Sequence, residues 1–463
     1  MKPKATYWRW SIVAMLFLAT AINYLDRQVL SLTWEDFIRP EFGWTNNNYG
    51  TITGVFSLVY AIALLFAGSF VDKLDTKKGY IWSIAIWSAG AMLHALCGIG
   101  TNAICEAFDM VGKITLVSMT LFLLARCVLA IGEAGNFPAA NKAVAEYFPS
   151  KDRAFATSVF NAGSTIGALA APFCIPVLAA KYGWEMAFII IGALGFIWLG
   201  LWIFVYDKPE KSKFVGEEEL AYIRQDETAA SAAKEAASEK VGGEKVGLWE
   251  CFKLKQTWAF IVGKGLTDGV WWFFLFWMPS YLKNVYGMRS TEPRFQIAIA
   301  VLYLIVMLSL AGGYLPTYFV EKKKMKPFNG KMRAMLIFAF LPLVALAAQP
   351  LAHISYWLPV CLVGIAAAAH QSWSANIFST VGDMFPAGSI ATVTGIGGMA
   401  GGLGSFFIQK GAGLLFDASE AGAWTVLGAH GIQAGYIIMF SYCAIAYLLA
   451  WCIMKALLSR KKA

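Results

Sequence analysis

Charge is scarce in this sequence. Only 14% of its 463 residues are Asp, Glu, Lys or Arg, 58% are hydrophobic, and the mean hydropathy is +0.57. A soluble domain carries roughly 25% charged residues. The chain therefore has too little polar surface to dissolve, which excludes a soluble enzyme.

Recognisable catalytic and metal-binding patterns are also missing. The eight cysteines form no CxxC pair, and no HExxH or GxSxG set has the sequence context of an active site. We therefore expect no metal site, no cofactor and no disulfide framework. The first apolar stretch lacks a small-residue cleavage site and contains Asp26 and Arg27, so it is interpreted as a retained first span rather than a signal peptide.

The abundant feature is a series of apolar blocks of about 20 residues, the length that crosses a hydrocarbon core roughly 30 Å thick. Backbone groups in lipid must hydrogen-bond to one another, so such runs are expected to be helices. The sequence predicts an all-α membrane protein with twelve transmembrane helices, near residues 8–32, 47–70, 78–100, 114–136, 153–178, 185–206, 256–282, 294–319, 334–350, 352–379, 388–416 and 432–457.

The positions of the basic residues predict the orientation in the membrane. Most of the 38 Lys and Arg residues fall in segments on the same side as the N-terminus, which is the positive-inside pattern. Both termini are therefore expected in the cytoplasm, and the loop that fits least well is 283–293. The formal charge of +9 then reflects orientation in a lipid bilayer and not a nucleic-acid partner.

A polar break divides the chain into two parts. Residues 207–255 are predicted to form a cytoplasmic linker, whose Ala/Glu/Lys-rich middle favours solvated helix. The linker joins an N-terminal six-helix bundle, 1–206, to a C-terminal one, 256–463. AEYFP at 145–149 recurs as GDMFP at 382–386, which indicates a duplicated unit. Parallel repeats place a substrate site at their interface near mid-membrane.

Glycines recur at nearly the same offset, in the fifth and eleventh predicted helices. Gly163 and Gly167 correspond to Gly398 and Gly402. Small residues let helices approach closely in lipid, and this packing role is sufficient to explain them.

Four ionisable residues lie inside the predicted spans. A charge at the bilayer centre costs roughly 2.5–3.5 kcal/mol, so Asp26, Arg27, Arg126 and Glu133 each need a reason to be there. Arg126 and Glu133 are close to two helical turns apart and share a face. One interpretation is a structural cluster of mutually neutralising charges. The other is that Arg27 or Arg126 receives an anionic substrate while a carboxylate carries a proton.

The seventh predicted helix combines charges with a run of aromatic residues. Lys264 and Asp268 are spaced to pair on one face. Trp271 and Trp272 lie deep enough to face a sugar ring, whereas the later aromatic residues of this helix, Trp277 and Tyr281, are expected in the belt at the membrane surface.

The tenth predicted helix is unusually polar. His370, Gln371, Trp373 and Asn376 predict a lined cavity, although amides there can also hold helices together. His370 occupies the position that corresponds to Glu133 at an offset of 237 residues. Further candidates for contacts with substrate hydroxyls are Asn161, Tyr24 and Tyr60.

Several motifs resemble known transporters. GSFVDKLDTKK at 68–78 resembles the loop between the second and third helices of the major facilitator superfamily, although Asp75 stands where glycine is usual. NYLDRQ, RCVLAIGEAGNFPA and AYIRQD resemble the anion:cation symporter family. KGLTDGVWWFFLFWMPSYL and AHQSWSANIFSTVGDMFP look like the hexuronate transporters of that family, and the resemblance covers essentially the whole chain.

The resemblance implies roles for matching residues. Arg27 would hold the substrate carboxylate, and Asp26 and Glu133 would be the protonation sites. Arg126 would pair with ionised Asp26. The residues that would contact substrate hydroxyls are Tyr24, Gln371 and Asn376.

The expected function is proton-coupled import of a hexuronate, such as glucuronate or galacturonate, by alternating access. The expected protein is a monomer in the bacterial inner membrane, with the major facilitator fold. The alternatives are an organophosphate or other organic-anion exchanger, then a channel, and last a membrane-embedded enzyme.

Overall fold

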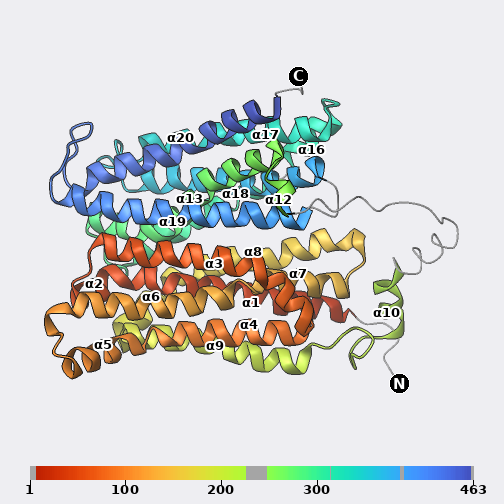
Figure 1. Ribbon diagram of the computed structural model, residues 1–463, viewed down its shortest axis with the longest axis horizontal. Helices are drawn as coiled ribbons and strands as arrows, with labels where there is room; N and C mark the ends of the chain where they lie inside the picture. Colours follow the sequence, from red (N-terminus) through yellow and green to blue (C-terminus); the bar gives the residue numbers. More distant parts are fainter. Residues whose placement is uncertain (1–6, 226–247, 313, 386–389, 460–463) are drawn as a thin grey trace.

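The computed structural model describes residues 7–225, 248–312, 314–385 and 390–459. Over these residues the chain is helical, and its only β interaction is an isolated bridge between Val426 and Ala429. The predicted all-α class is confirmed. Figure 1 shows long helices that run side by side in two groups, one above the other.

The first group, drawn in red to yellow-green in Figure 1, is formed by the chain up to residue 205. Its elements are α1 Trp8–Thr33, η1 Trp34–Ile38, α2 Arg39–Phe42, α3 Asn46–Leu74, α4 Thr76–Leu93, α5 Leu96–Ala107, η2 Val111–Lys113, α6 Ile114–Glu133, α7 Asn136–Tyr147, α8 Ser150–Tyr182 and α9 Trp184–Val205.

The second group, drawn in green to blue, begins at residue 255. Its elements are α13 Lys255–Tyr286, α14 Pro293–Val306, α15 Ser309–Gly312, α16 Leu315–Glu321, α17 Pro327–Phe340, η3 Leu341–Ala347, α18 Trp357–Met384, α19 Ile390–Glu420 and α20 Ile432–Ser459. Two short helices, α10 Glu217–Ile223 and α12 Leu248–Cys251, lie between the groups in sequence.

Eight helices in the described part of the chain are long and apolar enough to cross a membrane, and a ninth is added if α4 and α5 form one span bent by 54°. The helix predicted over 78–100 is therefore broken, between Leu93 and Leu96. The helix predicted over 294–319 is likewise interrupted, because α14 ends at Val306. Twelve spans remain a prediction.

The repeated sequence motif has a matching backbone. Helix α7 ends before Phe148 and α18 ends before Phe385, and both phenylalanines are extended, with φ −129°. Two residues 237 positions apart thus end a helix in the same conformation, as expected of a duplicated unit.

Glycines bring helices into backbone contact. A Cβ atom on Gly163 or Gly167 of α8 would lie 2.2 Å from the carbonyl oxygen of Phe17 or Ala21 of α1. Only glycine fits at this distance, which confirms the packing role inferred for these two residues.

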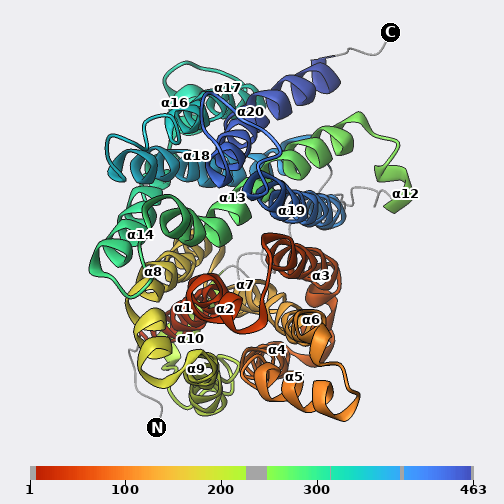
Figure 2. The same cartoon turned by 90° about the vertical axis from the view of Figure 1, so that its left-hand side faces the viewer.

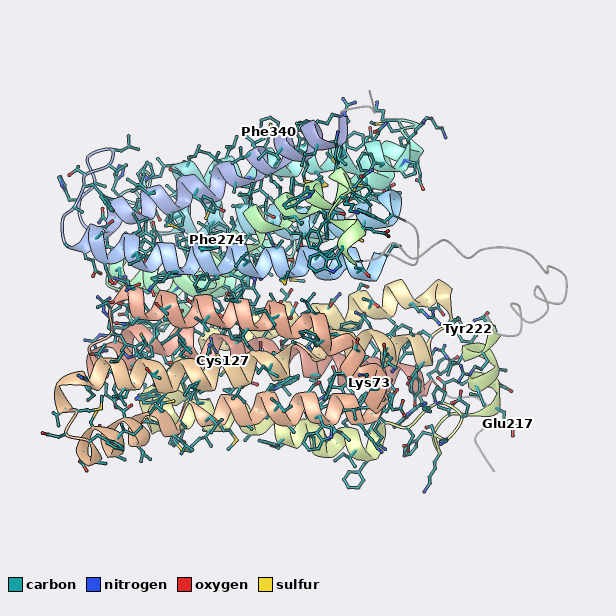
Figure 3. All side chains as sticks on the ribbon, in the orientation of Figure 1. Lys73, Cys127, Glu217, Tyr222, Phe274 and Phe340 are labelled. Carbon is teal, nitrogen blue, oxygen red and sulfur yellow. The ribbon has the colours of Figure 1, made fainter. Side chains whose placement is uncertain are left out.

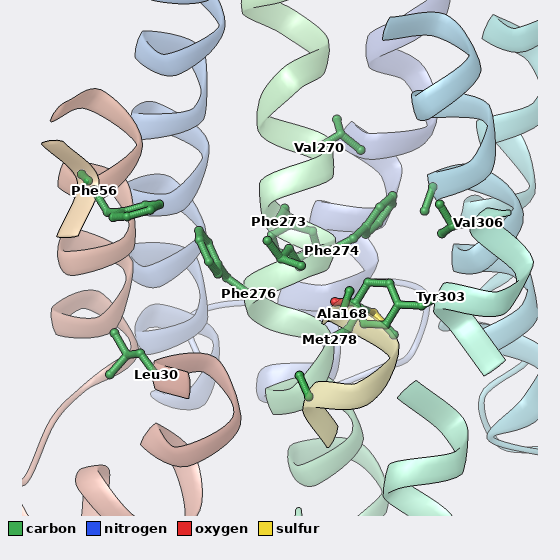
Figure 4. Packing of buried hydrophobic residues seen from close by; sticks show 14 of the residues in the cluster. Leu30, Phe56, Ala168, Val270, Phe273, Phe274, Phe276, Met278, Tyr303 and Val306 are labelled. Atoms are coloured by element: carbon green, nitrogen blue, oxygen red, sulfur yellow. The ribbon is translucent and has the colours of Figure 1, made fainter. Parts of the chain in front are cut away.

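The two groups meet along α3 and α19, which lie next to each other in the end-on view of Figure 2. A Cβ atom on Gly50 would lie 2.5 Å from the carbonyl oxygen of Gln409, and one on Gly413 would lie 2.5 Å from that of Asn46. Figure 4 shows Phe56 of α3 directed toward Phe276 of α13, with ring centroids 6.2 Å apart. Backbone and aromatic contacts therefore join the groups.

The beginning of the polar segment is folded against the first group. Glu219 of α10 accepts hydrogen bonds of 3.0 Å from the backbone N–H groups of Trp8 and Arg9, the first residues of α1. Since a helix N-terminus favours a carboxylate, this contact fixes α10 to α1. The Ala/Glu/Lys-rich stretch for which solvated helix was predicted falls largely at 226–247, outside the described residues.

Candidate functional site

A buried ion pair lies in the interior of the first group. Arg27 of α1 donates from Nη2 and Nε to the same oxygen, Oε2, of Glu133, at 2.6 and 2.9 Å. Glu133 is the last residue of α6, and the side chains of Arg27 and Glu133 are 2% and 0% exposed. Such a charge-assisted contact, shielded from water, is stronger than an exposed one.

Aromatic rings surround the Arg27 guanidinium. Its central carbon lies 5.0 Å from the ring centroids of both Tyr24 and Tyr60, 5.6 Å from that of Phe56 and 4.7 Å from that of Trp272. These distances are within the range of cation–π attraction. Trp272 belongs to α13, so the ring closest to Arg27 comes from the second helix group.

Arg126 of α6 lies beside this pair. Its Nη2 donates to the backbone oxygen of Arg27 at 2.9 Å, and its guanidinium lies 4.8 Å from the Phe56 ring. Its Nε and Nη1 are buried without a hydrogen-bond partner among the described residues. Arg126 therefore retains unused donors inside the protein.

Asp26 is buried, yet it does not pair as the resemblance implied. Neither of its carboxyl oxygens has a hydrogen-bond partner in the described part of the chain, and Arg126 contacts a backbone oxygen instead. Successive residues on a helix point about 100° apart, so Asp26 cannot face Glu133 in the way that Arg27 does. It nevertheless interacts electrostatically with Glu133 and Arg126 and lies near the Trp87 indole.

The second group supplies another set of contacts between candidate residues. The Trp271 ring stacks on His370 with centroids 5.9 Å apart and planes 10° apart. Nδ1 of His370 is 2.8 Å from the hydroxyl of Tyr447 on α20. These two contacts hold the His370 ring in one orientation, and Trp271 provides one of them.

The expected pair on α13 is present. Lys264 Nζ lies 2.7 Å from Asp268 Oδ2 and 4.0 Å from the Phe378 ring centroid. The Lys264 side chain is 4% exposed, so it does not reach out to solvent. The two charges neutralise each other within the second group.

The other candidates on α18 are packed or only partly exposed. Asn376 donates to the backbone oxygen of Ser372 at 2.8 Å. Trp373 is fully buried, and its Nε1 has no partner among the described residues, whereas Gln371 is half-buried. Asn161 is exposed on α8 and joins neither set of contacts within the described chain.

Sequence reasoning misplaced two residues and missed three. Trp277 and Tyr281 were expected at the membrane surface, which is wrong, because both are fully buried and Trp277 donates to Gln409 at 2.7 Å. The contacts of Phe56 and Tyr447 were missed, as was that of Asn23, whose Oδ1 accepts from Nη2 of Arg27 at 3.5 Å. Asn23 lies one helical turn before Arg27, a spacing that could have identified it, whereas an apolar Phe56 and a tyrosine in a span gave no signal.

At one end of the molecule, polar contacts join the two groups. Asp36 of η1 forms an ion pair with Lys283 and accepts from the backbone N–H of Ser290 at 2.8 Å. Further contacts join Arg39 to Glu420 at 3.3 Å, Lys410 to Asn47 at 2.6 Å and Trp34 to Ser280 at 2.9 Å. We call this the closed end; in Figure 1 it is the end that carries α2.

A carboxylate also caps a helix across the groups there. Asp417 of α19 accepts from the backbone N–H groups of Asn46 and Asn47, at 2.8 and 2.9 Å, at the beginning of α3. At the opposite end, no ion pair between described residues joins the two groups; Lys142 with Asp72 lies within the first group and Lys331 with Asp383 within the second. Among the described residues, ion pairs therefore join the two groups at the closed end only.

A bundle of long apolar helices with a buried charge cluster beside the contact between two groups is the arrangement of a membrane transporter. Residues 16–408 match the family model of the Major Facilitator Superfamily, and the chain belongs to this family. It is a multi-pass membrane transporter and not an enzyme.

Individual relatives agree with the family. A hexuronate transporter from Escherichia coli strain K12 is 28% identical over 418 residues, 88% of each chain. A galacturonate transporter from Dickeya chrysanthemi is 27% identical over 316 residues, 67% of this chain and 82% of the relative. The resemblance to hexuronate transporters is therefore confirmed.

Solved structures share the fold. A bacterial homolog to the human lysosomal transporter Spinster, in an inward-facing and unoccupied conformation, has a TM-score of 0.69 at 19% identity, with 99% of both chains covered. A D-xylose-proton symporter has a TM-score of 0.65 at 17% identity, covering 96% of this chain and 97% of its own. At these identities the likeness shows the fold alone.

Proposed function

We propose that this chain imports a hexuronate, such as galacturonate or glucuronate, together with protons, across a bacterial inner membrane. The observation that carries the proposal is the Arg27–Glu133 ion pair, enclosed by aromatic rings from both helix groups. Relatives named for hexuronate and galacturonate support the substrate class.

The pair offers a simple way to couple proton and substrate. Arg27 directs two N–H groups at one oxygen of Glu133, and a substrate carboxylate needs the same donors. A proton on Glu133 removes the charge that holds Arg27 and leaves the guanidinium to the substrate. Protonation of Glu133 and binding of the anion at Arg27 therefore favour each other.

The remaining buried groups fit the same role. Asp26 is the second protonation site, and Arg126 stabilises the cluster through the Arg27 backbone. Tyr24, Tyr60 and Trp272 line the Arg27 side, where flat rings and phenolic hydroxyls suit a sugar. Candidates from the second group that would complete the substrate contacts are Asp268, Trp271, His370, Gln371, Trp373 and Asn376, with Asn161 on α8.

Transport proceeds by alternating access between a bundle formed by residues 1–206 and one formed by 256–463, with 207–255 as a cytoplasmic linker and both termini in the cytoplasm. The protein acts as a monomer with twelve spans. The contacts of the closed end would break when the substrate enters from that side. The Asp36–Lys283 and Arg39–Glu420 pairs are the contacts that then separate.

The test is uptake of labelled galacturonate into liposomes that contain the purified protein, with a pH gradient and a membrane potential imposed separately. A hexuronate carries one negative charge, so symport with one proton responds to the pH gradient alone. With two protons the potential adds about 2.3 kcal/mol per 100 mV. No response to either gradient would refute symport, and inhibition by inorganic phosphate would instead indicate an organophosphate or phosphate exchanger.

A further inference from the structure

A groove of about 390 Å³ lies between α3, α4 and α6, away from the charge cluster. Its walls are almost entirely apolar and include the side chains of Ile62, Ala63, Phe66, Phe70, Ile86 and Ile131. All three helices belong to the first group, so the groove does not depend on how the two groups meet.

The groove opens on the outer surface of the helix bundle. Ile131 and Glu133 are two residues apart on α6 and so point to nearly opposite sides. Glu133 is buried against Arg27, whereas Ile131 is 51% exposed and Phe66 of α3 is 67% exposed. In a membrane protein, large apolar side chains exposed in this way face the lipid.

The wall of the groove formed by α3 is followed on the same helix by a lysine, Lys73. Phe66, Phe70 and Lys73 are spaced i, i+4 and i+7 along α3, so all three lie on one helix face. Lys73 is exposed in the last turn of α3 and has no ion-pair or hydrogen-bond partner among the described residues. Figure 3 labels it in the first group, toward the end that carries α10.

The neighbouring helix, α4, also combines a lysine with large apolar residues, although here the lysine comes first in the sequence. Lys78, Trp82 and Ile86 are spaced i, i+4 and i+8 along α4. Trp82 is 56% exposed, and Lys78 is exposed at the beginning of the helix. An exposed tryptophan between an apolar stretch and a lysine is typical of the boundary between hydrocarbon and headgroups.

We propose that this groove binds one anionic glycerophospholipid, with an acyl chain between α3, α4 and α6 and its phosphate at Lys73 and Lys78. The apolar walls match a chain and exclude a soluble anion as the whole ligand. Lys73 follows the apolar lining residues of α3 and Lys78 precedes Ile86 on α4, and neither lysine has an acidic partner in the described part of the chain, which favours an anionic headgroup over a zwitterionic one. Because the site lies in one helix group, lipid binding is independent of the transport substrate.

The test uses the purified full chain in detergent. The lipid that it retains is counted by native mass spectrometry during titration with phosphatidylglycerol or phosphatidylcholine. Each lysine near a headgroup contributes about fivefold in affinity, so Lys73→Gln should reduce the preference for phosphatidylglycerol by about that factor. Lys455→Gln is the matched control, since Lys455 is an exposed lysine near the end of α20, a helix that does not line this groove. Equal effects of the two changes would overturn the proposal.

A second variant tests the acyl chain without altering charge. Ala63→Phe fills the groove and should weaken binding of both lipids while transport persists. Unchanged binding in this variant would overturn the acyl-chain assignment, as would displacement of the lipid by soluble glycerol phosphate. Saturating galacturonate should leave lipid affinity unchanged, so failure of the hexuronate proposal would not affect this result.

Discussion

Arg27 and Glu133 are 106 residues apart in the chain, and they form an ion pair of 2.6 Å between α1 and the last residue of α6. Both charges of this pair have left water, and the attraction between them offsets only part of that penalty. A pair of this kind contributes little to stability compared with apolar packing. In the mechanism that we propose, its value is that a proton or a competing substrate carboxylate can break it.

The aromatic ring from the second group should matter for substrate affinity. Trp272 lies 4.7 Å from the Arg27 guanidinium, and a desolvated cation–π contact is worth about 0.5–2 kcal/mol. Trp272→Ala should therefore weaken galacturonate binding about tenfold, as measured by titration calorimetry, and Trp272→Phe should retain most of the affinity.

Trp258 provides the control for this change. It lies on the same helix, and its indole donates to the backbone oxygen of Phe252, away from Arg27. Trp258→Ala should leave affinity unchanged. Equal losses in the two alanine variants would mean that the ring acts only through helix stability.

The closed end should open when a side chain is added at Gly413. A Cβ atom there would lie 2.5 Å from the backbone oxygen of Asn46 and 2.9 Å from the Cα of Asn47, so leucine must separate α19 from α3. Nitroxide labels at Lys113 and Ala421, in a chain without its native cysteines, would report the separation by pulsed electron paramagnetic resonance. We expect longer distances in Gly413→Leu.

Gly411 offers a matched position two residues earlier on α19, because a Cβ atom there would meet nothing within 4 Å. Gly411→Leu should keep the distances of the unaltered protein. If Gly413→Leu kept them as well, the glycine contact would not hold the closed end together.

The loop between α3 and α4 contains a strained residue. Asp75 has φ 74° and ψ 155°, a region that is essentially confined to glycine and costs about 1–3 kcal/mol for other residues. Its carboxylate compensates by accepting from the N–H of Thr76 at 2.9 Å and pairing with Lys208 at 3.3 Å. Asp75 stands where glycine is usual in the motif that this loop resembles, and its backbone lies in a region that favours glycine.

Two substitutions at Asp75 should distinguish the cost of its strained backbone from the benefit of its side-chain hydrogen bond to the Thr76 N–H. Asp75→Ala keeps the strain and loses the cap, so thermal unfolding should show a loss of about 1 kcal/mol. Asp75→Gly removes the strain and should be at least as stable as the unaltered protein. An alanine variant as stable as the glycine variant would show that the conformation carries no strain.

Lowering the pH should weaken the contacts of the Asp75 carboxylate with the Thr76 N–H and Lys208. Burial raises the pKa of Asp75, but the Thr76 N–H and Lys208 outweigh it, so the pKa lies below its usual value. A lowered pKa adds stability above the unfolded-state pKa of about 3.9, and this contribution is lost as the pH falls through the folded-state value. Because the contact is largely exposed, the effect should be small.

Much of the helix arrangement could be predicted from hydrophobic length alone. The helix expected at 185–206 is α9, Trp184–Val205, and that at 114–136 is α6, Ile114–Glu133. The break between α4 and α5 and the π-helix at Trp34–Ile38 could not be predicted, because they depend on packing that leaves no periodic signal.

The charge cluster was foreseeable, but its pairing was not. Any ionisable residue in an apolar span stands out, which identified Asp26, Arg27, Arg126 and Glu133. The choice of partner depends on how α1 is rotated relative to α6, so only the structure joins Arg27 to Glu133 and leaves the Asp26 oxygens without a hydrogen bond among the described residues. The contribution of Trp272 from the other group likewise requires the tertiary fold.

Proton uptake on substrate binding is the most direct test of the account. Galacturonate is added to the purified protein in weakly buffered solution, and the change in pH is recorded. If the substrate carboxylate displaces Glu133 from Arg27, the unaltered protein should take up a proton at Glu133, whereas Glu133→Gln should still bind galacturonate but take up fewer protons. Binding with no proton uptake in the unaltered protein, or the same uptake in Glu133→Gln, would contradict the proposed coupling.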